Sequence, residues 1–288
     1  MRSIKLLNIR IDCPVREELG KLLKASYLGS DRIEVGKINT EFLLRAVKNQ
    51  EFRNTINSFD LNIADGSGVL WAAKYSSLPL VSTPFLRQIQ AVWQMLYTGL
   101  SLIFKPSYCC DVIPERFPGV EALFMMLRLA EKTKTPVFFL GAEKKVSDLL
   151  PGRIKKDFPE LIIAGNHEGY NLNNEEIIDK INRSKAILLI VALGSPKQEY
   201  WIRDNKDKLK SVRVAVGEGG SLDFLVGENK RAPRFMRKAG LEWLWRLFVN
   251  TNKTGEVETR SKRRFGRVWQ AVPVYVYTVV KYKLKREA

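Results

Sequence analysis

The chain has few of the residues that build metal sites or disulfide frameworks. Its 288 residues include three cysteines and one histidine. Cys13 stands alone and Cys109 and Cys110 are adjacent, so neither a metal-ligand spacing nor a disulfide pattern is present, which is typical of a reducing compartment. The single histidine, His167, completes no triad and no metal set, and we expect it to be structural or peripheral. These residues therefore offer no metal site, and no cofactor is expected.

Several motifs that define function classes are also missing. The chain has no G-x-x-x-x-G-K-[ST] loop of a P-loop NTPase and no G-x-G-x-x-G dinucleotide fingerprint. It has no Asp-x-Asp pair, the usual carboxylate holder of a metal-bound nucleotide sugar. The N-terminal apolar run, Leu6–Ile11, is too short for a signal peptide, so we expect a cytoplasmic protein.

Positive charge is abundant and unevenly placed. The formal net charge is +17, and residues 228–288 hold 16 Lys or Arg against 5 Asp or Glu. Basic clusters at Arg260–Arg267 and Lys281–Arg286 flank the apolar, aromatic run Val268–Val280, an arrangement that suits an anionic membrane surface. A solvated tail is the alternative. Nucleic acid is disfavoured because no helix-turn-helix or zinc-finger pattern accompanies the charge.

Apolar runs of strand length alternate with helical patterns such as Val120–Lys132 and Glu175–Ser184. This alternation predicts an α/β protein with a doubly wound, mostly parallel, Rossmann-like sheet. We expect a catalytic domain over residues 1–227 and a basic, membrane-associating appendage over 228–288. The expected strands are Ile4–Ile11, Arg32–Ile38, Leu61–Ala64, Pro136–Gly141, Leu161–Gly165, Ala186–Gly194 and Val212–Gly217.

A helical insertion at about 78–112 interrupts this alternation. Within it, apolar and polar residues of Phe85–Lys105 each recur every three or four positions, which predicts an amphipathic helix with a wide apolar face. Its polar stripe argues against a transmembrane span. Two interpretations stay open: a helix packed on the sheet, or a helix lying in the plane of a membrane.

The stretch Ala186–Glu199 points most directly to chemistry. Its apolar run fits a strand buried on both faces, and it stops at Gly194. Ser195 and Pro196 are expected to be the N-cap and first position of a helix whose first turn holds Gln198 and Glu199. Helix N-termini at the carboxyl ends of parallel strands bind phosphorylated ligands.

Other strand ends carry polar residues or glycines. Asp65 follows a predicted strand, where it serves either as a general base or as the cap of the next helix. Val214–Asp223 is a Gly-rich turn whose backbone N–H groups can cradle a diphosphate. Tyr170 either stacks on a base or packs in the core, and Arg116 lies in a loop before a helix.

Taken together, these segments resemble the WecG/TagA/CpsF glycosyltransferase family, which builds cell-wall and surface polysaccharide linkage units. The similarity covers about Ile33–Leu247 with its blocks in the family's order. In chain order the blocks are Asn39-Thr40-Glu41-Phe42, Asp65-Gly66-Ser67-Gly68-Val69, Pro114-Glu115-Arg116 with Gly119, Gly141, Gly169-Tyr170, Val191–Glu199, Gly220-Ser221-Leu222-Asp223, Arg231-Ala232-Pro233 and Leu241-Glu242-Trp243-Leu244-Trp245-Arg246.

The resemblance implies an inverting, metal-independent transfer of an N-acetylmannosamine-type sugar from a UDP donor to N-acetylglucosamine linked by diphosphate to undecaprenol. Asp65 matches the family's catalytic base, and Arg116 matches an arginine near the leaving diphosphate. The remaining matches are to substrate-binding positions: Asn39, Gly141, Gly194, Gln198 and Glu199 around the pocket, Tyr170 and Asp223 around the nucleotide, and Arg231 and Arg246 in the C-terminal part that closes the site and meets the membrane.

Two residues depart from the family pattern. Lys37 stands where a threonine is usual, and Glu218 lengthens the Gly-rich turn. The alternative function is a non-catalytic nucleotide-sugar-binding protein that docks on a membrane. The expected partners are a UDP-sugar, a polyprenyl-diphosphate-linked acceptor and an anionic membrane at the inner face of the cell membrane, and a homo-oligomer is left open.

Overall fold

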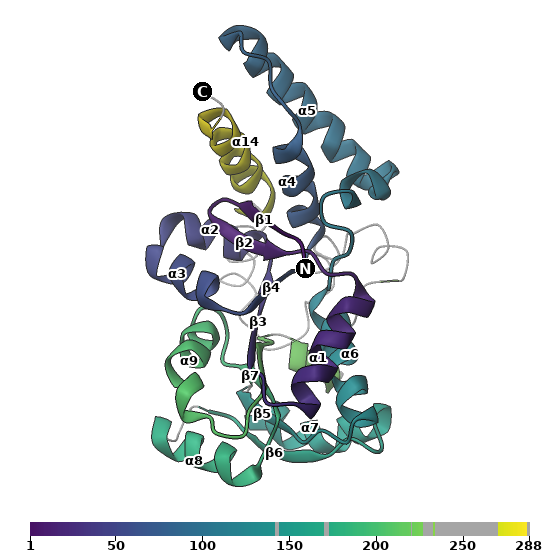
Figure 1. The fold of residues 1–288 in the computed structure, drawn as a ribbon, viewed down its shortest axis with the longest axis vertical. Helices are drawn as coiled ribbons and strands as arrows, with labels where there is room; N and C mark the ends of the chain where they lie inside the picture. Colours follow the sequence, from purple (N-terminus) through teal and green to yellow (C-terminus); the bar gives the residue numbers. More distant parts are fainter. Residues whose placement is uncertain (142–143, 170–172, 220, 227–232, 234–269, 287–288) are drawn as a thin grey trace, which may run out of the picture.

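A computed structural model describes residues 1–141, 144–169, 173–219, 221–226, 233 and 270–286 of the chain. Within this part, eight strands form one sheet in the order β1-β2-β4-β3-β8-β7-β5-β6 (Figure 1). The strands are β1 (Ser3–Leu6), β2 (Ile9–Asp12), β3 (Ile33–Ile38), β4 (Leu61–Ala64), β5 (Val137–Gly141), β6 (Ile163–His167), β7 (Leu188–Ala192) and β8 (Val214–Gly217).

The described helices lie between and around these strands. They are α1 (Arg16–Leu28), α2 (Thr40–Lys48), α3 (Gln50–Ser58), α4 (Ser67–Ser77), α5 (Pro84–Phe104), α6 (Gly119–Lys132), α7 (Lys144–Asp157), α8 (Asn174–Ser184), α9 (Lys197–Asn205), α10 (Ser221–Leu225) and α14 (Tyr275–Arg286), with short helical turns η1 (Pro106–Cys110), η2 (Lys206–Lys208) and η3 (Gln270–Val274).

The predicted α/β architecture with a mostly parallel sheet is confirmed. Every described strand pair except β1–β2 is parallel. Successive residues of β5, such as Phe138 and Phe139, point to opposite faces and enter different apolar clusters. One cluster joins the sheet to α1, α6 and α7, and the other joins it to α8 and α9, so both faces are covered.

The N-terminal run does not form the single strand predicted for Ile4–Ile11. It folds into an antiparallel hairpin, β1–β2, in which Ser3 pairs with Asp12. The turn consists of Leu7 and Asn8, whose φ angles are 47° and 65°. Asparagine adopts this left-handed conformation readily, whereas leucine rarely does. Only one of the two turn residues is therefore of a type that indicates a turn in the sequence.

One predicted strand is displaced by two residues. The prediction was Leu161–Gly165, whereas β6 spans Ile163–His167. Leu161 is fully buried although it precedes the strand. Leu161 lies in a loop but fills the core, so the hydrophobic run in the sequence starts before the strand does. A prediction from the pattern therefore places the start of the strand too early.

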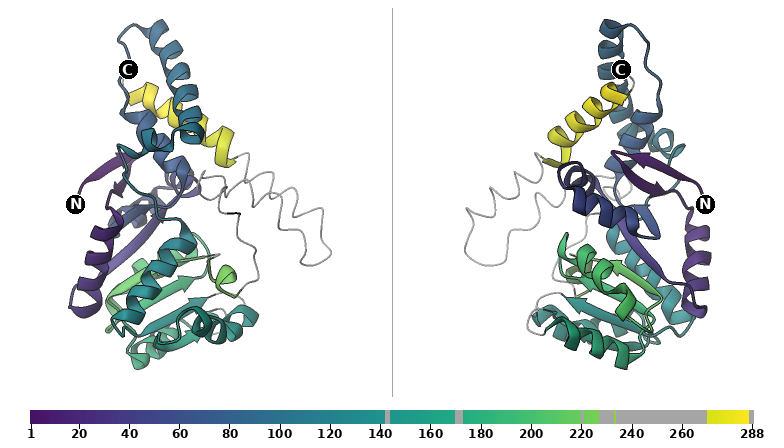
Figure 2. Two further views of the ribbon diagram at one scale, coloured as in Figure 1. Left: turned by 90° about the vertical axis from the view of Figure 1, so that its right-hand side faces the viewer. Right: turned by 60° about the vertical axis from the view of Figure 1, so that its left-hand side comes forward.

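Helices α4, α5 and α14 stand together at one end of the molecule, beyond the hairpin and opposite α8 (Figures 1 and 2). The amphipathic helix predicted over Phe85–Lys105 is present as α5. It packs against α4, α14 and η1. Among the described residues, no helix combines the length and the apolarity that crossing a membrane requires.

Candidate active site

The carboxyl ends of the parallel strands bring the predicted site residues to one edge of the sheet. Asn39 follows β3, Asp65 follows β4, and Glu218 follows β8. Gly141 ends β5, and Gly194 lies two residues after β7. Since β4, β3, β8, β7 and β5 are consecutive neighbours in the sheet, these positions form a continuous row. Ligands of open α/β sheets bind at this edge.

Asp65 is held between two neighbouring segments. Its backbone N–H donates to the Ile38 carbonyl of β3 at 2.8 Å. The carbonyl of the preceding residue, Ala64, accepts from the Phe117 N–H at 2.7 Å, which places the loop containing Arg116 beside the end of β4. Gly66, and not Asp65, is the N-cap residue of α4.

A buried ion pair lies next to Asp65. Lys37 Nζ donates a short hydrogen bond to Glu218 and a second one, at 3.2 Å, to the carbonyl of Gly119 at the start of α6. A Cβ atom on Gly119 would lie 3.1 Å from Ser221 Oγ, 3.3 Å from Lys37 Nζ and 4.0 Å from Asp65 Oδ1. A side chain at position 119 would therefore crowd Ser221 and Lys37 and would touch Asp65 at ordinary contact distance.

The protonation of Glu218 depends on this cluster. Burial raises the pKa of the Glu218 carboxyl above its ordinary value, and the negative charge of Asp65 adds to that effect. The Lys37 ammonium and the Ser221 hydroxyl oppose it. Asp65 and Glu218 thus interact electrostatically, with Lys37 as the local counter-charge.

A second polar cluster lies on the other side of the β8 turn, at the start of α9. Gln198 Nε2 donates to Glu199 Oε1 at 2.7 Å, and Gln198 Oε1 accepts from the Gly194 N–H at 3.2 Å. Both side chains are buried. A Cβ atom on Gly217 would lie 2.5 Å from Gln198 Nε2, so the glycine lets β8 approach this pair closely.

Glu199 is the less satisfied member of the second cluster. Its Oε2 atom is buried and has no hydrogen-bond partner in the part of the chain that the structure describes. Burial raises the pKa of its carboxyl, and the hydrogen bond from Gln198 and the nearby Ser195 hydroxyl oppose the shift. A buried carboxylate oxygen without a partner is costly, which makes it a position where a ligand hydroxyl would be stabilising.

The start of α9 differs from the prediction. The helix begins at Lys197 with Pro196 as its N-cap and without a side-chain capping bond. Ser195 is therefore not the N-cap, and the Ser195–Pro196 peptide bond is cis. Gly194 has a φ of 80°, a left-handed conformation that glycine adopts without strain.

The other predicted residues fall into two groups. Asn39 caps α2, with its Oδ1 accepting from the Phe42 N–H at 3.0 Å, so this oxygen is engaged in the helix cap. Arg116 is half-buried. Tyr170, Arg231 and Arg246 and the side chain of Asp223 lie outside the described residues.

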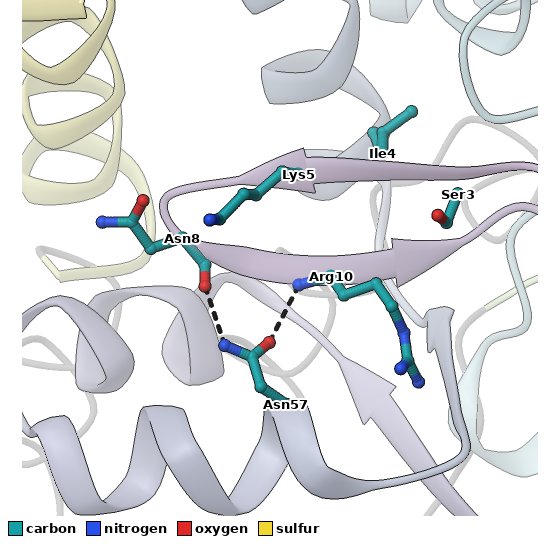
Figure 3. Close-up of a pocket in the computed structure, with 6 residues that line it drawn as sticks. All are labelled: Ser3, Ile4, Lys5, Asn8, Arg10 and Asn57. Atoms are coloured by element: carbon teal, nitrogen blue, oxygen red, sulfur yellow. Dashed lines mark hydrogen bonds between the residues drawn. The ribbon is translucent and has the colours of Figure 1, made fainter.

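The structure also contains an open hollow of about 410 Å³ at the hairpin edge of the sheet, away from this row (Figure 3). It is lined by Ser3, Ile4, Lys5, Asn8, Arg10 and Asn57. The Asn57 side chain bonds to the hairpin backbone: it accepts from the Arg10 N–H at 3.0 Å and donates to the Asn8 carbonyl at 2.9 Å. These contacts fasten the hairpin to α3.

His167 is engaged in the turn after β6. Its Nδ1 atom accepts from the Gly169 N–H at 2.9 Å. Burial lowers the pKa of its ring, and the positive charge of the nearby Lys180 lowers it further. Across the described residues, no group of three His, Cys, Asp or Glu side chains gathers as metal ligands do.

The sequence interpretation treated Lys37 and Glu218 only as departures from a pattern and did not identify them as a pair. A lysine inside an otherwise apolar strand and a glutamate inside a Gly-rich turn are each unusual. The sequence signal for the ion pair was a positive and a negative residue at the carboxyl ends of two predicted strands. Predicting the pair would have required knowing that β3 and β8 are neighbours in the sheet.

Comparison with known proteins places this geometry in context. The family model for the glycosyl transferase WecG/TagA/CpsF family matches residues 4–84 and 82–288. A Bacillus spizizenii protein called N-acetylglucosaminyldiphosphoundecaprenol N-acetyl-beta-D-mannosaminyltransferase is 30% identical over 262 residues, covering 91% of this chain and 84% of that protein. A Staphylococcus aureus protein of the same name is 26% identical over 247 residues, covering 86% and 79%. The chain belongs to the WecG/TagA/CpsF family of glycosyl transferases.

Proposed function

We propose that this chain transfers N-acetylmannosamine, or a closely similar N-acetylhexosamine, from a UDP donor to N-acetylglucosamine carried on undecaprenyl diphosphate, with inversion at the anomeric carbon. The names of the two relatives suggest the transferred sugar and the acceptor; the UDP carrier and the inversion are part of the proposal. The observation that carries the proposal is the placement of Asp65 at the carboxyl end of β4, next to the N-cap Gly66 of α4 and bordered by Lys37 and Glu218.

In the proposed reaction Asp65 is the general base. Its carboxylate takes the proton from the acceptor hydroxyl as that oxygen attacks the anomeric carbon from the face opposite UDP. The new glycosidic bond forms while the bond to the UDP oxygen breaks, and UDP leaves with the electron pair. One carboxylate suffices, because inversion needs a single displacement and no covalent intermediate.

The leaving diphosphate gains negative charge, and in the proposed reaction positively charged groups of the protein stabilise it without a metal ion. Arg116, on the loop hydrogen-bonded to the end of β4, supplies a guanidinium. The N-termini of α4, α6 and α9 lie at the same edge and add the positive ends of their helix dipoles.

The remaining predicted residues complete the proposed pocket. Asn39, Gly141, Gly194, Gln198 and Glu199 line the sugar and acceptor side. Tyr170 and Asp223 surround the nucleotide, and Arg231 and Arg246 belong to the C-terminal appendage that closes over it. The proposed site of action is the cytoplasmic face of the membrane that holds the lipid acceptor.

The test is exchange of Asp65 for asparagine, which keeps the shape and removes the basic carboxylate. We expect Asp65→Asn to lower kcat by about 100-fold or more in transfer from UDP-N-acetylmannosamine to a lipid-linked N-acetylglucosamine acceptor. UDP binding, measured by calorimetry, should stay within about twofold of the unchanged protein, since the base contacts the acceptor and not the nucleotide.

The matched control is Asp148→Asn on α7, an exposed carboxylate that does not belong to the site. It should leave both readouts unchanged. Full activity of Asp65→Asn would refute the base assignment. Absence of transfer by the unchanged protein with every UDP-N-acetylhexosamine tried, together with UDP binding, would favour the non-catalytic binding protein instead.

A further inference from the structure

Helix α5 has the reverse of the usual distribution of polar and apolar residues. Its buried residues are Ala91, Gln94 and Thr98, two of them polar. Ten large apolar side chains of the same helix are exposed, among them Trp93 at 61% and Phe104 at 81%. The exposed set is Phe85, Leu86, Ile89, Val92, Trp93, Leu96, Tyr97, Leu100, Ile103 and Phe104.

Specific polar contacts fix this orientation. Gln94 Nε2 donates to the Pro79 carbonyl at 2.9 Å, and Gln94 Oε1 accepts from Lys283 Nζ of α14 at 2.6 Å. The same ammonium donates to the Tyr75 carbonyl of α4 at 2.7 Å and lies 4.3 Å from the centre of the Tyr75 ring. Lys283 is 1% exposed. Because a buried ammonium must keep these acceptors, α5 cannot rotate its apolar face inward without a large cost.

The apolar face is long and continuous. Its members recur along all 21 residues of α5, a length of about 30 Å at 1.5 Å per residue. The ribbon views place α5 at the end of the molecule, next to α14 and away from the sheet (Figures 1 and 2). A single apolar patch of this extent on a soluble surface marks a site of interaction.

The charges around this face select the partner. Residues 75–110 contain Arg87 and Lys105 and no acidic residue, and residues 270–286 contain four basic residues and no acidic one. Lys281, Lys285 and Arg286 of the neighbouring α14 are exposed. Asp111, which follows η1, is paired with Lys74, so the remaining charges beside this face are mainly positive. An apolar face with such a border matches an anionic bilayer, whereas a second copy of this chain would bring like charges together.

The aromatic residues agree with this choice. Trp93 and Tyr97 lie on the exposed face with their rings stacked at a centroid distance of 5.2 Å. Trp and Tyr favour the boundary between headgroups and acyl chains. A helix that is apolar along one side only lies in the plane of the bilayer, with that side toward the acyl chains.

We propose that α5 is an in-plane membrane helix whose apolar face inserts into one leaflet of an anionic bilayer, with the basic residues of α14 contacting the lipid phosphates. This inference does not depend on the transfer reaction, because it concerns binding to lipid alone. Its test therefore uses vesicles without donor or acceptor sugar.

The first experiment compares two triple variants of the full chain. One replaces three exposed residues of α5, Trp93→Gln, Leu96→Gln and Leu100→Gln. The control replaces three exposed apolar residues on other elements, Leu28→Gln, Val47→Gln and Leu149→Gln. Vesicles of phosphatidylglycerol mixed with phosphatidylcholine are the probe. We expect the α5 variant to bind at least about tenfold more weakly than the unchanged protein, and the control to bind equally well.

The second experiment locates one residue. Lipids brominated near the glycerol end of the acyl chain should quench the fluorescence of the bound protein, and Trp93→Phe should bind as well and lose part of that quenching. An equal loss of binding in both triple variants would overturn the proposal. So would unchanged quenching in Trp93→Phe. Self-association that the α5 triple variant abolishes, with vesicle binding unaltered, would overturn it in favour of a second copy of the chain.

Discussion

The Lys37–Glu218 ion pair is nearly inaccessible to water, and its removal can be predicted in magnitude and in pH dependence. The Lys37 side chain is 6% exposed and that of Glu218 is 0% exposed. Taking away one partner leaves the other as an uncompensated buried charge, which costs about 3–5 kcal/mol. Taking away both leaves no charge to bury, so the double change should cost less than the two single changes together.

The perturbations are Lys37→Met, Glu218→Gln and the double variant. Lys37→Met removes the ammonium but keeps the length of the side chain, and we expect it to lower the free energy of unfolding by about 3–5 kcal/mol near pH 7. Glu218→Gln should cost about 2–3 kcal/mol, because its amide oxygen and the Gly119 carbonyl still accept from Lys37. The coupling energy of the cycle should reach at least about 2 kcal/mol.

The pH dependence has a definite sign. Without Lys37, the pKa of Glu218 in the folded protein stays raised above its unfolded value, because burial is the leading cause of the shift. The folded state then binds the proton more tightly, so stability falls as the pH rises from the unfolded pKa toward the folded one. The loss caused by Lys37→Met should therefore be smaller near pH 5.5 than near pH 7, by up to about 2 kcal/mol.

Urea unfolding followed by the fluorescence of the six tryptophans measures all four proteins. The reasoning is refuted if both single variants stay within about 0.5 kcal/mol of the unchanged protein, or if the double variant costs the full sum of the single ones. A deficit of Lys37→Met that grows as the pH falls would contradict the role assigned to Glu218.

Two further perturbations test other parts of the fold. Burial and, after it, the neighbouring Asp60 raise the pKa of Glu34 to about 7. Because the folded state binds this proton more tightly, the unchanged protein should lose about 2 kcal/mol of stability between about pH 4.5 and pH 7, and Glu34→Gln should remove that loss. Parallel pH profiles of the two proteins in urea unfolding would contradict this. Gly141 has a φ of 106°, and a Cβ there would lie 2.5 Å from the backbone of Ala192. Gly141→Ala should therefore cost at least about 2 kcal/mol, while Gly20→Ala, which meets nothing within 4 Å, should be neutral or stabilising by up to about 1 kcal/mol in thermal unfolding.

The sheet was predictable because buried parallel strands leave long apolar runs in the sequence. Leu61–Ala64 was predicted to the residue, and β3, β5, β7 and β8 each lie within their predicted runs. The hairpin was not, because its turn uses Leu7 in a left-handed conformation that no pattern of residue types announces. Tertiary contacts with α3 through Asn57 hold that turn in place.

The sequence predicted which residues lie at the candidate site, but not which of their side chains contact one another. Parallel strands must bring Asn39, Asp65 and Gly194 to one edge, and strand order is not needed to conclude this. That Lys37 faces Glu218 depends on β3 lying next to β8, two strands separated in sequence by more than 170 residues. Local patterns carry no information about such an adjacency.

The same limit explains the exposed face of α5. Periodicity established a helix with one polar and one apolar side, and burial of the apolar side is the usual outcome. The opposite outcome follows from Lys283, whose ammonium needs Gln94 as an acceptor and reaches it from 189 residues away. Long-range polar contacts of this kind, which local periodicity does not reveal, help to fix which side of α5 faces the protein.

Helix α4 links this face to the candidate site. Its N-terminus follows Asp65, and the Gly68 carbonyl accepts from Tyr275 Oη of α14 at 3.2 Å. Near its other end, the Tyr75 carbonyl accepts from Lys283 of the same α14. The two contacts brace α4 along its 11 residues, about 16 Å of rigid helix. Under the proposed function, α5 holds the protein on the bilayer that carries the acceptor lipid, and the length of α4 then sets the height of Asp65 above the membrane at which it meets the acceptor sugar.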